Sequence, residues 1–289
     1  MHTSGGNIVT KNKELSPMAN DVRRYDYDRW LSCLFAPKEA RDGLFALLAF
    51  NIEIARVRET VSEPLLGDIR LQWWRDALRD LSNKKSKSHP VVEALHDLNN
   101  VKAIDFGLML EMVDIRAKDL DPSPIETKGD LIVYADLTGG ALHQMLYRAL
   151  GGDDNSVRLE AAARSGRAYA LTGILRAIPF HAQNGLVLMP TRVLSDYSMT
   201  VDTVFKPDNR EKFAQIVRKM TDFTKEELIH AKSQAHLIGK GQKASILCNG
   251  ISGIYLKQLE KVKYEPSDAR LDINAARKIA ALFGYKLFA

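Results

Sequence analysis

The chain has 289 residues, which allows one large domain or two small ones and is enough to bury a sizeable core. Hydrophobic residues make up 45% and charged residues 27%, which excludes a disordered chain, and no apolar run reaches the roughly 18 residues of a membrane-spanning helix. The net charge of +5 permits anionic partners such as diphosphates, acidic lipid headgroups or nucleic acid, but selects none of them.

Cysteine usage and the first residues bear on where the protein works. Two cysteines, Cys33 and Cys248, are too few for a disulfide scaffold or a four-cysteine zinc site, which predicts buried thiols in a reducing compartment. Residues 1–20 lack the apolar core of a secretory signal and the Arg-rich pattern of a transit peptide. We therefore expect a flexible tail over residues 1–20 and a helical domain over residues 21–289.

Helical periodicity recurs along almost the whole chain and runs of alternating β-branched residues are absent, which predicts an all-α fold. In chain order, we expect helices over residues 20–35, 37–58, 67–82, 90–100, 103–121, 127–151 and 156–185. A loop closed by Pro190 follows, and two or three further helices should lie within about residues 208–263 and 268–288. No repeat or flexible linker divides the chain, which predicts a single domain.

The loop "NKKSKSHP" at residues 83–90 is basic. Its flanks supply neither the aromatic nor the arginine partners of a nucleic-acid site, so we expect a solvated surface and no nucleic-acid partner. The histidines form no His-Glu-x-x-His pattern, and His230 and His236 are six residues apart, which argues against a zinc site.

The stretch "AFNIEIARVRETVSEP", residues 49–64, carries charges where a buried helix should continue. Arg56 and Arg58 are two positions apart and cannot share a helix face, so at most one of them points inward. Two interpretations of Arg56 stay open. It is either an anion clamp or the ion-pair partner of Glu53 or Glu59, each three residues away on the same helix.

Four motifs give the chain a family resemblance. They are "LFAPKEARDGLFALLAFN", "RLQWWRDAL", "YADLTGGALHQMLYRALG" and "GRAYALTGILRAIPFHAQNGLVLMP". In this order they resemble the squalene and phytoene synthase family, the head-to-head branch of the all-α isoprenoid synthases. The resemblance runs from about residue 25 to the C-terminus and implies a helical bundle around a central cavity.

In active members of that family, two Asp-rich stretches hold the magnesium ions that bind the substrate diphosphate. The first has the pattern Asp-Asp-x-x-Asp and the second Asn-x-x-x-Asp-x-x-x-Asp. The corresponding positions of this chain are Ala55, Arg56, Glu59, Gly173, Ala177 and His181. Only Glu59 keeps a carboxylate, and one carboxylate beside an arginine is a poor magnesium site. We therefore expect no cofactor and assign no catalytic or metal-binding residue.

Together with "FNIEIARVRETVSEPLLGDIRLQWWR", this loss resembles the sub-branch that contains the mitochondrial assembly factor of respiratory complex I and its bacterial relatives. The resemblance implies a non-catalytic protein of the bacterial cytoplasm or mitochondrial matrix, with peripheral membrane contact left open. It would bind an isoprenoid-like lipid or assist assembly of complex I. The alternatives are a purely structural adaptor and an active magnesium-dependent prenyl transferase. The latter would use the displaced carboxylates Glu53, Glu59, Asp68, Asp119 and Asp136.

Several further side chains are candidates for binding a substrate or an anion. They are Arg75, Arg116, Asp119, Asp136 and Arg176. All of them except Arg176 have a structural interpretation beside the functional one. Arg75 would pair with an acid across the bundle while Trp73 or Trp74 packs in the core, and Arg116 would form a buried ion pair with Asp119. Asp136 precedes a Gly-Gly pair that allows close approach of backbones. His181 would serve a structural or capping role.

Overall fold

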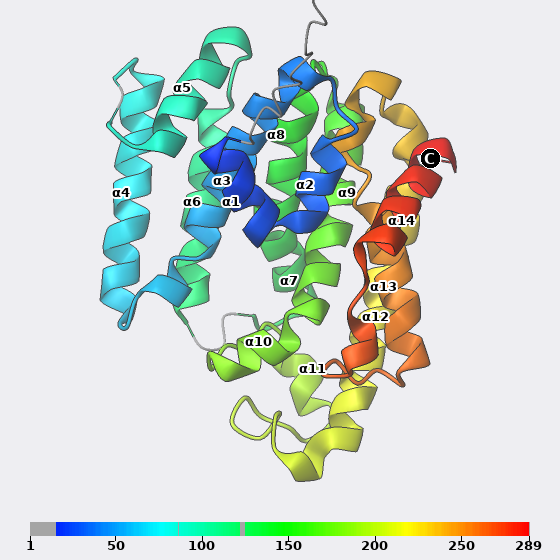
Figure 1. Ribbon diagram of the computed structural model, residues 1–289. Helices are drawn as coiled ribbons and strands as arrows, with labels where there is room; N and C mark the ends of the chain where they lie inside the picture. Colours follow the sequence, from blue (N-terminus) through cyan, green and yellow to red (C-terminus); the bar gives the residue numbers. More distant parts are fainter. Residues whose placement is uncertain (1–15, 86, 122–124, 289) are drawn as a thin grey trace, which may run out of the picture.

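The computed structural model describes residues 16–85, 87–121 and 125–288, and over these residues the fold is all-α, as the periodicity predicts (Figure 1). The first seven helices are α1 (Pro17–Tyr25), α2 (Tyr27–Cys33), α3 (Arg41–Ala55), α4 (Pro64–Ser82), α5 (Pro90–Val101), α6 (Phe106–Ile115) and α7 (Lys128–Ala135). The others are α8 (Ala141–Ala149), α9 (Ser156–Arg176), α10 (Ile178–Gln183), α11 (Thr191–Ser195), α12 (Arg210–Ser233), α13 (Asn249–Lys261) and α14 (Ala275–Phe288).

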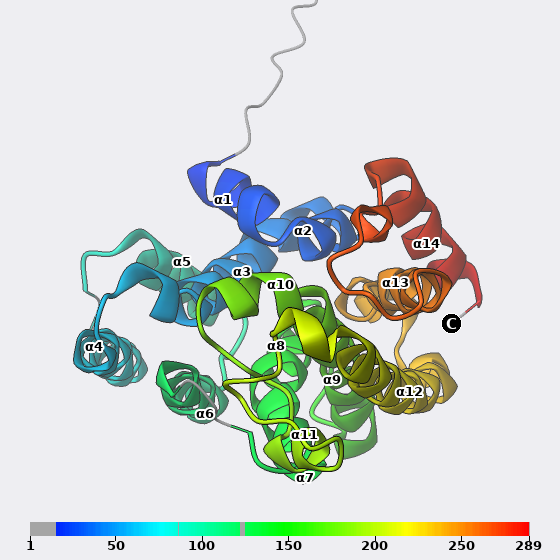
Figure 2. The same ribbon diagram turned by 90° about the horizontal axis from the view of Figure 1, so that it is seen from below.

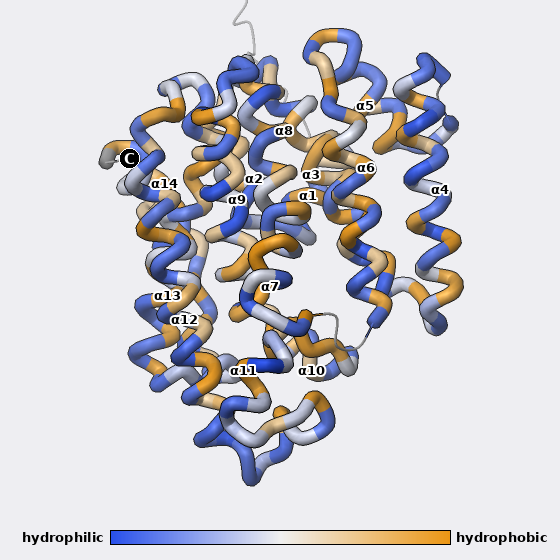
Figure 3. The backbone as a smooth tube through the Cα atoms, turned by 180° about the vertical axis from the view of Figure 1, so that it is seen from behind, coloured by the Kyte–Doolittle hydropathy of each residue, from blue (hydrophilic) through white to orange (hydrophobic). Residues whose placement is uncertain are grey.

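The helices surround α8 and α9, which lie near the middle of the bundle when it is seen end-on, while α4 and α14 lie on opposite flanks (Figure 2). Hydrophobic and hydrophilic residues alternate along most helices, as expected where one face of each is buried (Figure 3). The buried apolar side chains form two clusters, one centred on α3 and α4 and the other on α9, α12 and α13. Cys33 and Cys248 are free and buried, as predicted. None of the described helices has an apolar stretch long enough to cross a bilayer.

The helix expected over residues 20–35 is two helices, because Asp26 interrupts it. The Asp26 carboxylate accepts a hydrogen bond from the Arg29 backbone N–H at 3.4 Å, which caps α2. The helix α1 begins at Pro17, so part of the segment expected as a tail is helical. Residues 1–15 of that predicted tail lie outside the described residues.

The helix α3 is apolar almost all round and buried, but it ends earlier than expected. Its last residue is Ala55, and Arg56 forms the C-cap. A single 3₁₀ turn, Arg58–Thr60, follows. The charged residues of "ARVRE" therefore lie at the end of a helix and in a turn, rather than along a continuing helix face.

The segment expected as one helix over residues 127–151 runs as α7 and α8 with a π-helical stretch, Asp136–Gly140, between them. At this stretch the backbone touches α9. A Cβ built on Gly139 would lie 2.4 Å from the Gly166 carbonyl oxygen, and one built on Gly166 would lie 2.1 Å from the Gly139 carbonyl oxygen. The predicted close approach of backbones at the Gly-Gly pair is thus confirmed, and its partner is a third glycine in α9.

Three other expectations about helix boundaries were wrong. The helix expected over residues 156–185 ends at Arg176, and Pro179 stands in the first turn of the separate helix α10, where its missing N–H is tolerated. The segment expected as a loop around Pro190 contains the short helix α11. The helix expected over residues 103–121 is α-helical only to Ile115 and continues as the 3₁₀ turn Arg116–Leu120.

Candidate functional site

The first stretch of degenerate positions lies at the end of α3. The Arg56 Nε donates to a Glu59 carboxylate oxygen at 3.2 Å, and the Arg56 guanidinium carbon lies 4.0 Å from the centre of the Tyr25 ring in α1. Glu53 is exposed on the same helix. Arg56 therefore forms an ion pair with Glu59, and its guanidinium stacks on α1.

Arg58 points in another direction and joins three elements. Its two terminal nitrogens donate to backbone carbonyl oxygens, one to Asp119 at 2.8 Å and one to Asn184 at 3.0 Å. Asp119 lies in the turn after α6, and Asn184 caps the C-terminus of α10. Arg58 thus ties the end of α3 to the element before α7 and to the segment that carries the second degenerate stretch.

Asp119 is the centre of a buried polar cluster. One of its carboxylate oxygens accepts the Tyr134 hydroxyl at 2.6 Å, and the other accepts an Arg116 terminal nitrogen at 3.2 Å. The same Arg116 nitrogen lies 2.9 Å from the Tyr134 oxygen. Burial and the Asp119 carboxylate raise the pKa of Tyr134, so the phenol keeps its proton and donates it. The carboxylate is therefore satisfied inside the protein.

The second stretch of degenerate positions lies across the end of α9 and into α10. Gly173 and Ala177 offer no oxygen ligand, and a Cβ built on Gly173 meets no atom within 4 Å. His181 occupies the third position, where burial lowers its pKa to about 4, helped by the nearby charges of Arg116 and Arg58. Its imidazole is neutral at physiological pH and stands beside guanidinium groups, which is a poor setting for a divalent cation.

Arg176, next to these positions, pairs with Asp28 of α2. An Arg176 terminal nitrogen lies 2.6 Å from one Asp28 oxygen, and the Lys278 Nζ of α14 lies 2.8 Å from the other. The Tyr169 hydroxyl also lies 3.3 Å from this carboxylate. Burial alone raises the pKa of Asp28, but Arg176 and Lys278 outweigh it and hold the pKa below its usual value. One buried carboxylate thus joins α2, α9 and α14.

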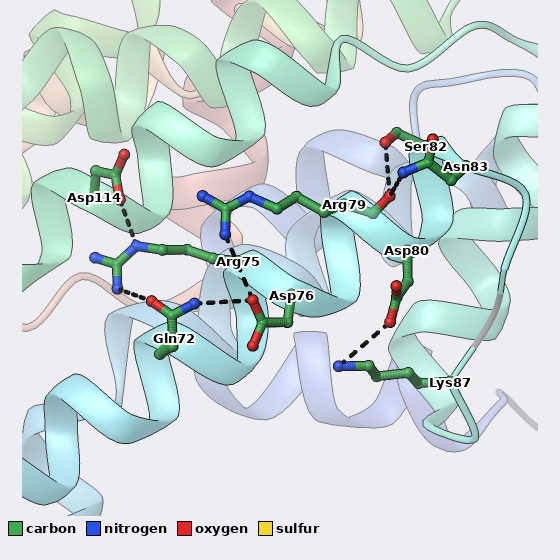
Figure 4. Close-up of polar contacts among 9 residues, drawn as sticks. All are labelled: Gln72, Arg75, Asp76, Arg79, Asp80, Ser82, Asn83, Lys87 and Asp114. Atoms are coloured by element: carbon green, nitrogen blue, oxygen red, sulfur yellow. Dashed lines mark hydrogen bonds and ion pairs between the residues drawn. The ribbon is translucent and has the colours of Figure 1, made fainter.

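The remaining candidates take part in contacts between helices. Asp136 accepts two hydrogen bonds from Arg167 of α9, at 2.6 and 2.9 Å, and Arg167 also reaches Glu227 of α12 at 3.2 Å. Figure 4 shows Arg75 of α4 reaching Asp114 of α6, and their nitrogen and oxygen atoms are 2.6 Å apart. The predicted pairing of Arg75 across the bundle is thus confirmed.

At least one tryptophan of α4 packs in the core, as predicted. Trp74 is 4% exposed and meets Phe50 edge-on at 5.3 Å between ring centres, whereas Trp73 is 36% exposed. Trp73 and Trp74 also line a hollow of about 290 Å³ between α3 and α4, together with Arg56 and Arg70. A larger hollow of about 510 Å³ lies between α10 and residues 204–213 and 265–268, at the lower end of the bundle in Figure 1.

Comparison with known proteins agrees with this architecture. The squalene/phytoene synthase family model matches residues 22–277. The chain belongs to the squalene/phytoene synthase family. It is 26% identical over 244 residues to NADH dehydrogenase (ubiquinone) complex I, assembly factor 6, of Mus musculus, an alignment that covers 84% of this chain and 73% of the mouse protein. It is also 26% identical over 169 residues to the 15-cis-phytoene synthase of Enterobacter agglomerans, covering 57% and 56% of the two chains.

Solved structures support the fold of this squalene/phytoene synthase family member. A dehydrosqualene synthase determined with a bound ligand superposes with a TM-score of 0.81 over 94% of both chains, at 18% identity. A squalene synthase of Alicyclobacillus acidocaldarius superposes with a TM-score of 0.75 over 86% of this chain and 94% of its own, at 14% identity. At these identities the likeness concerns the fold alone.

The metal site that the family implies does not fit this family member. Magnesium requires several oxygen ligands in near-octahedral geometry, and the six corresponding positions supply one carboxylate, which Arg56 already neutralises. Among the described residues, no three His, Cys, Asp or Glu side chains are grouped to hold a metal ion.

The displaced carboxylates of the catalytic alternative do not converge either. Glu53, Glu59 and Asp68 are exposed, Asp119 is enclosed by Arg116 and Tyr134, and Asp136 is bound by Arg167 on α9. These carboxylates therefore give the catalytic alternative no support.

Three residues of this squalene/phytoene synthase family member were missed by sequence reasoning. Arg58 was not named as a candidate. Its spacing of two residues from Arg56 could have identified it, because two residues at that spacing point in different directions and one of them can point inward. Asp28 and Lys278 gave no signal, because their contacts join residues 250 positions apart (278 − 28). Only the tertiary fold brings such residues together.

Proposed function

We propose that this chain is a non-catalytic member of its family that assists the assembly of respiratory complex I, in the mitochondrial matrix or the bacterial cytoplasm. The observation that carries the proposal is the reversal of charge where active relatives bind magnesium. Arg56 stands at one of those positions and is paired with Glu59, and the neutral His181 at another lies near the charges of Arg116 and Arg58, in place of a set of free carboxylates. The assembly role is supported by the likeness to complex I assembly factor 6 of Mus musculus, which extends over 84% of this chain.

This change of charge disfavours departure of a diphosphate for a physical reason. Departure of a diphosphate from an allylic carbon needs cations that neutralise the developing negative charge. Arg58 and Arg116 are cationic, but both terminal nitrogens of Arg58 and one of Arg116 are already hydrogen-bonded, to the Asp119 carbonyl, the Asn184 carbonyl and the Asp119 carboxylate. Freeing these nitrogens for a substrate would take hydrogen bonds away from the part-buried Asp119 carbonyl and carboxylate, which is unfavourable. These groups therefore hold three elements together, which is a structural role.

The catalytic part of the proposal is tested with purified protein, magnesium, and farnesyl or geranylgeranyl diphosphate. We expect no squalene, no phytoene and no cyclopropyl intermediate, while a dehydrosqualene synthase assayed in parallel turns over. Product formation by this chain, lost on chelation of magnesium, would overturn the non-catalytic assignment.

The assembly part is tested by deleting the gene in its own host. We expect the deletion to lower the amount of mature complex I on native gels and the NADH:quinone oxidoreductase activity of membranes, with both restored by the wild-type gene. Other respiratory complexes should be unchanged. Normal complex I in the deletion strain would refute an assembly role even if the protein proved inactive as a synthase.

A second candidate function is binding of an isoprenoid-like lipid without turnover, and one observation favours it. Space is open beside Gly173, where an added Cβ meets no atom within 4 Å. Native mass spectrometry with farnesyl diphosphate in the presence of a chelator tests this function. We expect a one-to-one adduct that Gly173→Trp abolishes. Absence of an adduct with the wild-type chain, or its persistence in the variant, would argue against a ligand at this place.

A further inference from the structure

Helix α14 carries large apolar side chains on the side that faces solvent, as well as on the side that packs against the core. Ile279, Phe283 and Leu287 are 38%, 53% and 75% exposed, and their i, i+4, i+8 spacing puts them along one side of the helix. The opposite side carries the buried residues Leu282 and Tyr285, which pack on the core. The outer apolar stripe is therefore additional to the face that holds α14 in the fold.

The stripe continues onto the end of α2. The Phe35 and Phe283 rings meet edge-on with centres 4.8 Å apart, and Leu34 beside Phe35 is 37% exposed. Figures 1 and 2 show α14 beside α2 at the same edge of the bundle. We call the exposed apolar side chains of this edge the α14 surface, and they are Leu34, Ile279, Phe283 and Leu287.

The charges on and beside the α14 surface are of one sign. No acidic residue occurs in α14, whose charged residues are Arg277, Lys278 and Lys286. The Lys286 Nζ lies 5.4 Å from the centre of the Phe35 ring, and Arg41 donates to the Leu34 carbonyl oxygen at 2.9 Å. Among the described residues, Arg41, Arg277 and Lys286 have no carboxylate within ion-pair distance, whereas Lys278 is committed to Asp28.

The acidic residues nearest in sequence are Asp272, which is exposed three residues before α14, and Glu39 and Asp42 after α2. Glu39 and Asp42, which follow α2, line a hollow of about 430 Å³ against α5, together with Asp97. Asp28, under α14, is buried and neutralised by two cations. Along α14 the apolar stripe is therefore accompanied by the basic residues Arg277 and Lys286, and the helix itself carries no acidic residue.

We propose that the α14 surface binds an anionic lipid bilayer. Basic residues flanking an apolar helix face that contains Phe and Leu are typical of helices that lie in the membrane interface, where the apolar face enters the headgroup region and the cations contact lipid phosphates. Protein interfaces, in contrast, are depleted in lysine at their centres and combine charges of both signs. The proposal adds a binding partner to the proposed function and does not depend on it.

The test measures co-sedimentation of the full chain with lipid vesicles. One set contains phosphatidylcholine alone and the other contains phosphatidylcholine with about one third phosphatidylglycerol, which supplies a negative surface. We expect binding to the anionic vesicles, weaker binding to the neutral ones, and loss of the difference at about 1 M salt, where charges are screened over roughly 3 Å.

Variants separate the apolar from the electrostatic contribution. Leu287→Ser should weaken binding to anionic vesicles by about tenfold, because an exposed leucine no longer enters the interface. Lys286→Glu should weaken it by about tenfold as well and remove the preference for anionic lipid. The matched control is Ile229→Ser, which removes an aliphatic side chain that is 64% exposed on α12, and it should bind like the wild type.

Each remaining outcome decides against the proposal. Equal binding to neutral and anionic vesicles, or unchanged binding of both α14 variants, would refute lipid recognition by this surface. A concentration-dependent dimer in light scattering that Leu287→Ser abolishes would show that a second copy of the chain covers the surface instead. Because Leu287 is three quarters exposed, its substitution is compatible with a folded protein, which thermal unfolding of the variant checks.

Discussion

Two glycines of α9 should respond in opposite ways to the same substitution. Gly166 faces the π-helical stretch between α7 and α8, and a Cβ there would lie 2.1 Å from the Gly139 carbonyl oxygen and 2.8 Å from the Gly140 Cα. Gly173, two turns later on the same helix, has nothing within 4 Å of an added Cβ. Comparing the stabilities of Gly166→Ala and Gly173→Ala therefore separates the effect of the close helix crossing from the effect of helix propensity.

The expected magnitudes follow from these distances. Replacing glycine by alanine inside a helix contributes up to about 1 kcal/mol of stability in the absence of other effects. At Gly173 nothing opposes this gain. At Gly166 the added methyl group meets backbone atoms, which cannot move away as a side chain can, so α9 must separate from the π-helical stretch. Overpacking of this kind costs typically 1–3 kcal/mol, and after the propensity gain of about 1 kcal/mol is subtracted from its upper end we expect a net loss of up to about 2 kcal/mol.

The assay is thermal unfolding followed by circular dichroism, with chemical denaturation as a second measure. For a chain of this size, 1 kcal/mol corresponds to about 2–4 °C in Tm, so Gly166→Ala should unfold up to about 4–8 °C earlier than the wild type. Gly173→Ala should unfold at the same temperature or about 2–4 °C later. Equal Tm values for the two variants would refute the argument that the crossing depends on glycine.

Three further predictions concern the buried charges and the aromatic core. Asp28→Asn should lower stability by about 3–5 kcal/mol, because it leaves two cations without their carboxylate. In the wild type the pKa of Asp28 is lowered in the fold, so its stabilisation is present above about pH 4 and lost as the pH falls through the folded pKa, which acid titration of unfolding measures. NMR titration should give His181 a pKa of about 4, and Arg58→Gln should raise it toward 6.5; an unchanged value would exclude the proximity of the two groups. Because the fold favours neutral His181, its contribution to stability falls as the pH decreases from about 6.5 to about 4. Trp74→Ala should cost about 3–5 kcal/mol and the more exposed Trp73→Ala clearly less, and equal losses in denaturation curves would contradict the assigned burial.

Much of the fold was predictable because helical periodicity is a local property. The positions of α4 and α5 follow from apolar spacing and flanking polar residues. The errors concern helix ends and breaks. Asp26 and Pro179 each mark the start of a new helix, because a capping carboxylate or a proline is favoured in the first turn. The apolar pattern continues across both positions, so the sequence was interpreted there as one longer helix. The π-helical stretch depends on contact with Gly166 and had no local signal.

The candidate site was less predictable than the fold. The motif comparison identified which positions lack metal ligands, and it does not require the tertiary structure. The replacement interactions were not accessible from the sequence, because each joins distant segments. Arg58 binds the carbonyl oxygens of residues 61 and 126 positions away, and Arg176 pairs with a carboxylate 148 positions away. Periodicity could show that Arg56 and Arg58 diverge, but not which of them reaches another helix.

The buried carboxylate of Asp28 has a consequence for how the chain folds during synthesis. Its partners Arg176 and Lys278 are made 148 and 250 residues later. At roughly 5–20 residues per second, the ribosome needs about 12–50 s to proceed from Asp28 to Lys278. During that interval α2 carries a charge intended for the interior and must stay near water or a chaperone. Helix α14 therefore completes the burial of α2, and the nascent protein buries the Asp28 carboxylate fully only after α14 has left the ribosome.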